Sequence, residues 1–440
     1  MPRGGHRWIL AELARLGRRP LSASEVYERS DALLRPALGY DGVCWHDSDP
    51  ATGLVTSVHT RDLRMADFRA AVELEVWGDG IATFPAIRVE GRTAESLSNA
   101  TRGRPARSRR WRELIQPAGY GDELRAVFDH RGGLWGCAAF MRAPDRGHYR
   151  PGELALASAA APLIGAALRL AAAAETPARD PEAAAHPARG SGAAAVLARG
   201  SGAAAVLARG SGAAAALART AGAATADSAP AVLVIGPDNR LVQADERGRA
   251  LAGELAAETG AVFGVPLPFV MAAEHARAAA GGMPVPALPL RARSADGTWH
   301  VLHASVLGAA DDGPPGAADG RAGRGDAGLA DGERGGEKTG RANGGAGSSG
   351  RAAVAVVAAP AGVGDLMPVV FAAFGLTGRE AQVATLAVRG LSTAGIAEAL
   401  AVSPWTVQDH LKAVFDKAGV RSRREFAALL MAGATGARHR

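Results

Sequence analysis

Two low-complexity segments divide this sequence and limit what it can fold into. In residues 176–229 the unit ARGSGAAAVL is repeated nearly three times from Ala188, with a period of ten residues. A solenoid repeat needs about 20–45 residues to build a packing surface, so this segment is predicted to be a linker. Residues 308–350 are rich in glycine and charged residues and hold too little apolar surface to offset the entropy lost on ordering. One core through the whole chain is excluded, and we expect separate domains.

The charge balance and the cysteine count exclude several classes of protein. The 440 residues carry 50 Lys and Arg against 44 Asp and Glu, a formal net charge of +6, which permits an anionic partner without requiring one. Cys44 and Cys137 are too few for a disulfide-rich secreted scaffold or a multicysteine zinc site. Both lie in apolar, strand-like runs, so we expect buried thiols in a reducing compartment.

Neither an export signal nor a membrane span is predicted. Near the N-terminus, Glu12 and Arg15 interrupt the apolar run before it reaches the length of a signal peptide. Residues 154–174 are long enough to cross a bilayer, but Pro162, Arg169 and a high alanine content favour a packed helix. We therefore expect a cytoplasmic protein with no membrane partner.

Residues 21–175 have the pattern of helices packed on an antiparallel sheet, and residues 1–20 are expected to form an N-terminal tail. Two hairpins are predicted, over 40–60 and 122–142, because strand-like runs flank turn residues in both places. An Ala-rich helix from Pro151 would close this α+β unit.

The phrase GYGDELRAVFDHRGGLWGCAAFMR, residues 119–142, resembles part of a GAF domain, a small-molecule sensing module of bacterial regulators. The resemblance implies a sensor whose effector is unknown, since GAF ligands vary. No arrangement for haem, bilin or a metal is present, and no cofactor is identified. Surface positions or local hydrogen bonds are expected for the scattered histidines, which are His46, His59, His130 and His148.

Residues 230–360 show the order of two strands, helices and three strands, interrupted by the segment 308–350. Asp296-Gly297 is a strong hairpin signal between two of the later strands. This order resembles that of a PAS domain, which implies a second antiparallel-sheet sensor with its own unidentified effector.

Residues 361–440 predict an all-α domain, because sharp helix signals recur within a short distance. Four helices are expected, and their N-cap residues are Thr377, Ser392, Ser403 and Ser422. Glu380 and Glu425 complete capping boxes, Pro404 occupies a first helical position, and Gly390 supplies a left-handed stop. The tight turn between the second and third helices indicates a helix-turn-helix module.

The third of these helices, over 403–417, has two distinct faces. An apolar stripe at helical spacing would hold it on the bundle and consists of Val407, Leu411, Val414 and Phe415. In a helix-turn-helix the second helix of the motif enters the major groove, which is about 12 Å wide and admits one α-helix. Polar residues on the opposite side are left facing outward.

About 55 residues of this region resemble the LuxR-type helix-turn-helix. The resemblance lies in the segment LTGREAQVATLAVRGLSTAGIAEALAVSPWTVQDHLKAVFDKAGVRSRREF. Ala401 departs from the glycine that many members have at the turn, and a left-handed alanine there would cost of order 1 kcal/mol. The resemblance implies that the base-facing residues are Gln408, Asp409 and Lys412. It also implies phosphate contacts from Thr406, His410, Arg421 and Arg423, and a dimer contact through Phe426, Leu429 and Leu430. Trp405 is expected to pack or to contact the DNA backbone.

The fold class expected is therefore multidomain α+β, with GAF-like and PAS-like sensors followed by a four-helix LuxR-type domain. That architecture implies a sequence-specific, DNA-binding transcription regulator that acts as a homodimer on double-stranded DNA and contacts RNA polymerase. Two alternatives keep the same DNA-binding end: a phosphorylation-switched response regulator and an autoinducer receptor. The acidic residues Asp41, Asp47 and Asp49 lie around an antiparallel-looking hairpin, which disfavours a receiver domain. An enzyme is not expected, because no nucleophile elbow, metal-binding helix or Walker loop is found.

Overall fold

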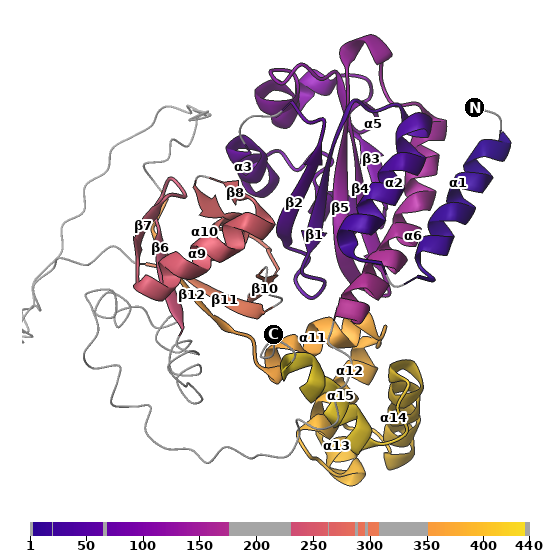
Figure 1. Cartoon of the computed structure of the whole chain (residues 1–440), viewed down its shortest axis with the longest axis vertical. Helices are drawn as coiled ribbons and strands as arrows, with labels where there is room; N and C mark the ends of the chain where they lie inside the picture. Colours follow the sequence, from indigo (N-terminus) through magenta and orange to yellow (C-terminus); the bar gives the residue numbers. More distant parts are fainter. Residues whose placement is uncertain are drawn as a thin grey trace, which may run out of the picture.

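The computed structural model describes residues 3–19, 21–64, 68–175, 230–262, 264–286, 289–294, 298–307 and 351–435 (Figure 1). The predicted linker 176–229, the segment 308–350 and the Asp296-Gly297 turn lie outside these residues. The described parts form two antiparallel sheets with helices and a helical C-terminal bundle, so the expected multidomain α+β class is confirmed.

The first unit, residues 3–175, is built on a five-stranded antiparallel sheet in the order β2-β1-β5-β4-β3. The strands are β1 Gly42–Ser48, β2 Val55–Arg61, β3 Ala94–Ser96, β4 Asp122–His130 and β5 Gly133–Arg142. Both predicted hairpins are present, β1 with β2 and β4 with β5. An antiparallel sheet is incompatible with the parallel receiver of a response regulator, at least within the described part of the chain.

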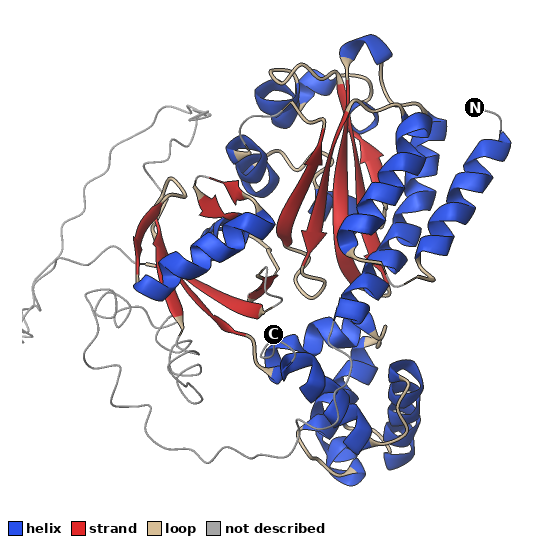
Figure 2. Ribbon diagram, in the orientation of Figure 1, coloured by secondary structure: helices blue, strands red, loops and turns tan. Residues whose placement is uncertain are grey.

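Three helices cover one face of this sheet (Figure 2): α1 Arg3–Leu16, α2 Ala23–Leu38 and α6 Pro151–Glu175. The expected N-terminal tail is therefore wrong in part. Ile9, Leu13 and Leu16 are buried at helical spacing, so α1 packs on α6 as part of the core. By length and composition Pro151–Ala172 could cross a membrane, but half of that stretch is buried inside the protein.

The other face of the first sheet is covered by short helices that the sequence pattern did not reveal. They are α3 Arg69–Trp77, α4 Phe84–Val89, α5 Leu97–Ala100 and a π-helical turn at Trp111–Ile115. Short 3-10 turns span Pro105–Arg107 and Pro144–Arg146. Both faces of β4 and β5 are thus buried, and so are the thiols of Cys44 and Cys137, as predicted.

The second unit, residues 230–360, has a five-stranded antiparallel sheet in the order β10-β11-β12-β6-β7. Its strands are β6 Ala231–Ile235, β7 Leu241–Ala244, β10 Leu290–Arg293, β11 Trp299–Val306 and β12 Val354–Pro360. The helices α9 Glu246–Thr259 and α10 Leu267–Ala280 pack on it, next to a small ribbon of β8 Ala261–Val262 and β9 Val265–Pro266. Leu54 and Val72 of the first unit share the core of the second unit, so the two units pack on each other.

Five helices form the C-terminal bundle: α11 Val363–Ala373, α12 Gly378–Val388, α13 Thr393–Leu400, α14 Pro404–Ala418 and α15 Arg423–Thr435. The last four are the helices expected from the capping signals. The first, α11, occupies the stretch between the second sheet and those four helices and contacts both α6 and α15. Figure 1 places α14 at the edge of the bundle, away from both sheets.

Candidate nucleic-acid interface

Capping residues define both ends of the helix α14. The hydroxyl of Ser403 accepts a hydrogen bond from the backbone N–H of Thr406 at 3.0 Å, and Pro404 occupies the first turn, where it needs no N–H partner. At the other end Gly419 adopts a left-handed conformation with φ 68°. These ends confine the helix to the stretch that the capping residues predict.

The turn that precedes α14 contains the one departure noted in the motif. Ala401 is left-handed, with φ 52° and ψ 48°, and its backbone N–H donates to carbonyls of the last turn of α13. A left-handed alanine costs of order 1 kcal/mol. Ala401 thus adopts the left-handed conformation that glycine would adopt, at this cost in free energy.

The buried side of α14 holds the helix on the bundle. Val407 and Val414 are fully buried and Leu411 nearly so. Val407 and Leu411 pack with Val383 and Ile396 of the two preceding helices. A second anchor is the ion pair between Lys417 Nζ and Glu380 Oε2, at 2.6 Å.

Glu380 is also the partner in the capping box of α12. Its backbone N–H donates to the Thr377 hydroxyl, and its carboxylate accepts the Thr377 backbone N–H at 2.7 Å. Burial alone would raise the pKa of Glu380, but hydrogen bonds from Lys417 and Thr377 outweigh it and hold the pKa below its usual range. The ionised carboxylate therefore ties α12 to α14.

The outward side of α14 carries the predicted base-facing residues. Gln408, Asp409 and Lys412 are all exposed, and none makes a hydrogen bond or ion pair with a residue that the structure describes. Trp405 lies one turn earlier on the same face and is 72% exposed, so it does not pack on the bundle, one of the two roles expected for it. The face thus presents three polar groups and one indole to the surroundings.

The four residues expected to contact phosphate have different surroundings. The hydroxyl of Thr406 lies 2.8 Å from that of Ser403, and His410 is half-buried. The side chain of Arg421 is exposed, whereas the guanidinium of Arg423 is engaged within the bundle.

Arg423 joins the start of α15 to the start of α13. Its guanidinium donates to the carbonyl of Leu391 at 2.6 Å and to the hydroxyl of Thr393 at 2.9 Å. Its first role in this structure is therefore to position two helices. Sequence spacing alone could not reveal this, because the partners are about 30 residues away in the chain.

The three residues predicted for a dimer contact differ in exposure. Phe426 and Leu430 are 1% and 3% exposed and lie in the bundle's own core. The ring of Phe426 stacks on that of Phe371 in α11, with centroids 6.1 Å apart. Only Leu429, which is half-buried, could reach a second copy without rearrangement.

The histidines and acidic residues of the first unit do not gather into a metal-ion site in the part of the unit that the structure describes. No group of three or more His, Cys, Asp or Glu that could hold a metal ion occurs in the described parts of the chain. His46 is half-buried with its Nδ1 atom enclosed, and burial lowers its pKa to about 3, so the ring is neutral near pH 7. His59 pairs with Asp47 at 2.9 Å, which fits the expected local bonding.

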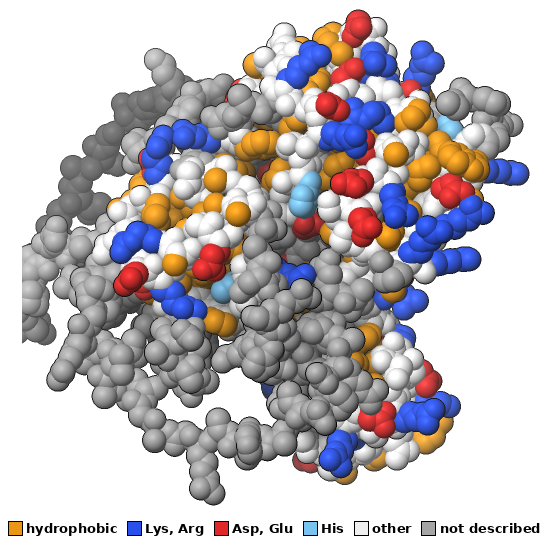
Figure 3. Space-filling model, viewed as in Figure 1, with side chains coloured by type: hydrophobic (Ala, Val, Ile, Leu, Met, Phe, Trp, Pro, Cys, Tyr) orange, Lys and Arg blue, Asp and Glu red, His pale blue; other side chains and the backbone are white. Residues whose placement is uncertain are grey.

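Charge on the surface does not by itself mark a nucleic-acid face. Figure 3 shows basic and acidic side chains interspersed over both the first unit and the C-terminal bundle. The net charge of +6 is therefore not gathered into one basic side on the face in view. The distinguishing feature of the bundle is the unpartnered face of α14.

Comparison with known proteins identifies the bundle. Residues 375–430 match the model of the family described as bacterial regulatory proteins, luxR family. Among solved structures, the phycoerythrobilin-bound GAF domain from a cyanobacterial phytochrome is similar with a TM-score of 0.26 and 15% identity, over 38% of this chain and 95% of that one. No curated protein sequence matches the chain. Residues 375–430 of the C-terminal bundle thus form a luxR-family domain, as their motifs indicate.

Proposed function

We propose that this chain, which carries a luxR-family domain over residues 375–430, is a sequence-specific DNA-binding transcription regulator. The observation that supports this best is the outward face of α14. It holds polar side chains that are exposed and unpartnered within the described structure, on a helix whose opposite side is fixed by buried valines and an ion pair.

The chemistry of that face suits the edges of base pairs in a major groove. An amide such as that of Gln408 can bond adenine through two atoms, a carboxylate such as that of Asp409 can accept from cytosine N4, and Lys412 can donate to guanine O6 or N7. Trp405 precedes them by one turn on the same face, where its indole would lie against the groove wall or a thymine methyl group. Each well-formed pair of this kind discriminates by about 1–3 kcal/mol.

Phosphate contacts would fix the register of the helix on DNA without reading sequence. Arg421 is suited to this role, because its guanidinium is exposed and makes no hydrogen bond in the described structure. Thr406 and His410 lie in the N-terminal half of α14, next to the predicted base-facing residues. Arg423 would act mainly by holding α13 and α15 in place.

The finer parts of the proposal concern regulation and assembly. We assign the regions 21–175 and 230–360 to GAF-like and PAS-like sensors that control the domain 361–440, in a cytoplasmic protein. One module offers limited contact area, so a homodimer on two half-sites would provide useful affinity. Its contact in α15 would centre on Leu429 rather than on Phe426 and Leu430. A contact with RNA polymerase completes the proposal.

The test is fluorescence-anisotropy binding of the full chain to DNA from its own upstream region and to scrambled DNA, at two salt concentrations. We expect tight binding that prefers the native sequence and weakens with salt. Gln408→Ala should lose about 1–3 kcal/mol of that preference. The matched control is Gln382→Ala on α12, outside the predicted base-facing face. Equal, weak binding of both DNAs by the full chain and by residues 361–440 alone would contradict the proposal.

A further inference from the structure

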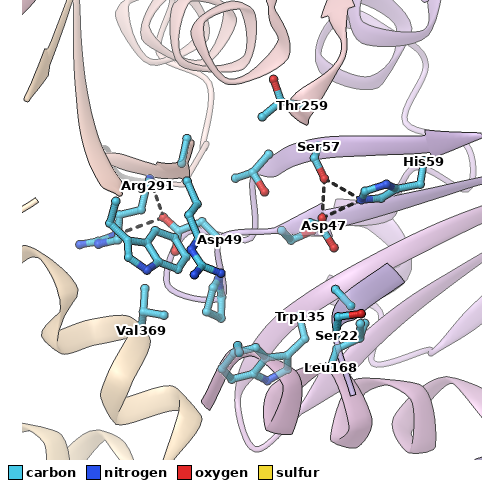
Figure 4. A pocket seen from close by; sticks show the side chains of 18 of the residues that line it. Ser22, Asp47, Asp49, Ser57, His59, Trp135, Leu168, Thr259, Arg291 and Val369 are labelled. Atoms are coloured by element: carbon cyan, nitrogen blue, oxygen red, sulfur yellow. Dashed lines mark hydrogen bonds and ion pairs between the residues drawn. The ribbon is translucent and has the colours of Figure 1, made fainter. Parts of the chain in front are cut away.

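A cavity of about 370 Å³ lies where the first unit, the second unit and α11 meet (Figure 4). Its walls come from all three parts, with Asp47 and Trp135 from the first unit, Arg291 and Trp299 from the second, and Val369 from α11. Ligand pockets have volumes of roughly 300–1,000 Å³ and often form between domains. This cavity is separate from the opposite face of the first sheet, where Arg125 and Glu123 fill the space under α3 and α4.

The carboxylate of Asp47 offers the cavity an acceptor. It accepts hydrogen bonds from the hydroxyls of Tyr27, at 2.6 Å, and Ser57, and lies 2.9 Å from His59 Nε2. A carboxylate has about four acceptor positions, so one is left after these three partners. The side chain is 31% exposed and lines the cavity. A donor on a bound molecule can therefore reach it.

The arrangement is not that of a nucleophile and base. Ser57 and Asp47 both approach the same nitrogen of His59, and Ser57 bonds Asp47 directly. A serine nucleophile needs its base to face the hydroxyl with one nitrogen and an orienting group with the other. Binding, not covalent chemistry, is what this cluster can do.

The charges and the apolar side chains that line the cavity indicate which class of molecule it can bind. Among the described lining residues Asp47 and Asp49 oppose Arg291 and Arg293, so their formal charges cancel. A cavity without net charge favours a neutral ligand over an anion or a cation. Trp135, Trp299 and Leu168 supply flat and aliphatic surface for a ring.

One residue of the cavity wall, Arg291, also anchors the helix α11. The backbone N–H and the guanidinium of Arg291 donate to Asp49 at 3.1 and 3.2 Å, and its Nε donates to the carbonyl of Asp365 in the first turn of α11. Asp49 and Arg291 are both buried. At the far end of α11, Arg169 of α6 donates to the carbonyl of Ala373. The helix that packs on Phe426 is therefore fixed at both ends by the two upstream units.

We propose that this cavity binds a neutral, ring-containing small molecule with an N–H or O–H donor directed at Asp47, and that the contact of Arg291 with Asp49 and α11 transmits its binding to the C-terminal bundle. The second half of this proposal rests on the proposed DNA-binding function. The first half does not, because binding in the cavity can be measured without DNA.

The probes are three molecules that share one ring: 4-(hydroxymethyl)benzamide, 4-(hydroxymethyl)benzoate and 4-(hydroxymethyl)benzylamine. Titration of the full chain at pH 8, where an ordinary imidazole is neutral, is followed by saturation-transfer NMR. We expect saturable binding of the amide, at least tenfold tighter than binding of either charged analogue. Equal binding of the three molecules, or no saturable binding of the amide, would overturn the assignment of the ligand class.

Two matched variants locate the binding. Ser24 is an exposed lining residue on α2, and Glu28 is exposed one turn further along the same helix, outside the lining. Ser24→Trp should fill the cavity mouth and abolish amide binding, whereas Glu28→Trp should leave it unchanged. Amide binding that survives Ser24→Trp would show that the molecule binds elsewhere and would overturn the site.

Transmission is tested by repeating the DNA titration with saturating amide. We expect the DNA affinity of the wild type to change at least fivefold, as is usual for coupled sites. Arg291→Lys keeps the charge but shortens the reach to Asp365. At an amide concentration that saturates the variant, the change in DNA affinity should fall to less than twofold. An unchanged DNA affinity in the amide-bound wild type would overturn transmission and leave the site standing. Absence of DNA binding under any condition would instead contradict the proposed function.

Discussion

Charged and polar side chains serve opposite purposes in the first unit and in the C-terminal bundle. Under the first sheet Glu123, Arg110 and Arg125 are 1%, 2% and 6% exposed, and the carboxylate pairs with both guanidinium groups at 2.8 and 3.0 Å. On the outward face of α14, Gln408, Asp409 and Lys412 are exposed and have no partner in the described structure. A buried charge must keep its partner, whereas an exposed one contributes little to stability and stays available to a ligand. The first region should therefore control stability and the second should control DNA binding.

The strongest way to test this division is to remove the buried carboxylate. Glu123→Gln leaves Arg110 and Arg125 without their shared counter-charge, so we expect a loss of about 3–5 kcal/mol in the free energy of unfolding of the first unit. The measurement is urea unfolding followed by tryptophan fluorescence, with Glu28→Gln on the surface of α2 as the control. A loss below about 1 kcal/mol, within the usual range for surface substitutions, would contradict the burial argument.

The same carboxylate should make the first unit sensitive to acid. Burial alone would raise the pKa of Glu123, but Arg110 and Arg125 outweigh it and lower the pKa below its usual range. A depressed folded-state pKa stabilises the protein above the unfolded pKa of about 4.3, and that stability is lost as the pH falls through the folded value. We expect the stability difference between wild type and Glu123→Gln to be constant from pH 8 to 5 and to shrink below about pH 4. Urea titrations across that range measure it, and a difference that grows on acidification would contradict the sign.

The buried network also marks the limit of inference from the sequence. The strand-like run and its flanking turn predict β4, but they do not indicate that both faces of this strand are covered. Glu123 and Arg125 are two residues apart and hence on one face, a pattern that could have signalled a paired interior. The helices α3 and α4 that cover them are short and have little hydrophobic periodicity, so the sequence pattern did not predict them.

The sequence predicted correctly those features that depend only on residues close together in the chain. The caps of α12, α13 and α14 are in place because each needs only a hydroxyl and an N–H three residues later. Contacts between distant segments could not be foreseen: Asp49 and Arg291 are separated by 242 positions. The burial of Phe426 depends on Phe371 in α11, a helix that none of the four predicted N-cap residues marks.

Within the bundle, the partnered Arg423 and the exposed Arg421 allow the same comparison of partnered and exposed charges. Arg423→Ala removes two hydrogen bonds between α15 and the start of α13, so we expect a loss of about 1–2 kcal/mol in bundle stability together with weaker DNA binding. Arg421→Ala should leave stability within about 0.5 kcal/mol and reduce the slope of log affinity against log salt by about one. Thermal unfolding and salt-dependent anisotropy separate the two. Equal losses of stability would show that exposure does not distinguish these side chains.

The smallest expected effect concerns Trp405, which tests whether an apolar side chain can belong to the binding face. Its 72% exposure means that Trp405→Ala removes almost no packing, so the unfolding free energy should change by no more than about 0.5 kcal/mol. If the indole contacts DNA, part of its surface is buried only in the complex, and DNA affinity should fall by about 1 kcal/mol.

Comparison of Trp405→Ala with Trp405→Phe distinguishes a contact with DNA from a change in the helix start. Phenylalanine keeps a flat apolar surface and should restore most of the affinity, whereas a change in helix capping would leave the two variants alike. Anisotropy at two salt concentrations then shows the kind of contact, because an apolar contact lowers affinity without changing the salt slope. A large loss of stability in Trp405→Ala would instead place the indole among the packing residues and remove it from the exposed face of α14.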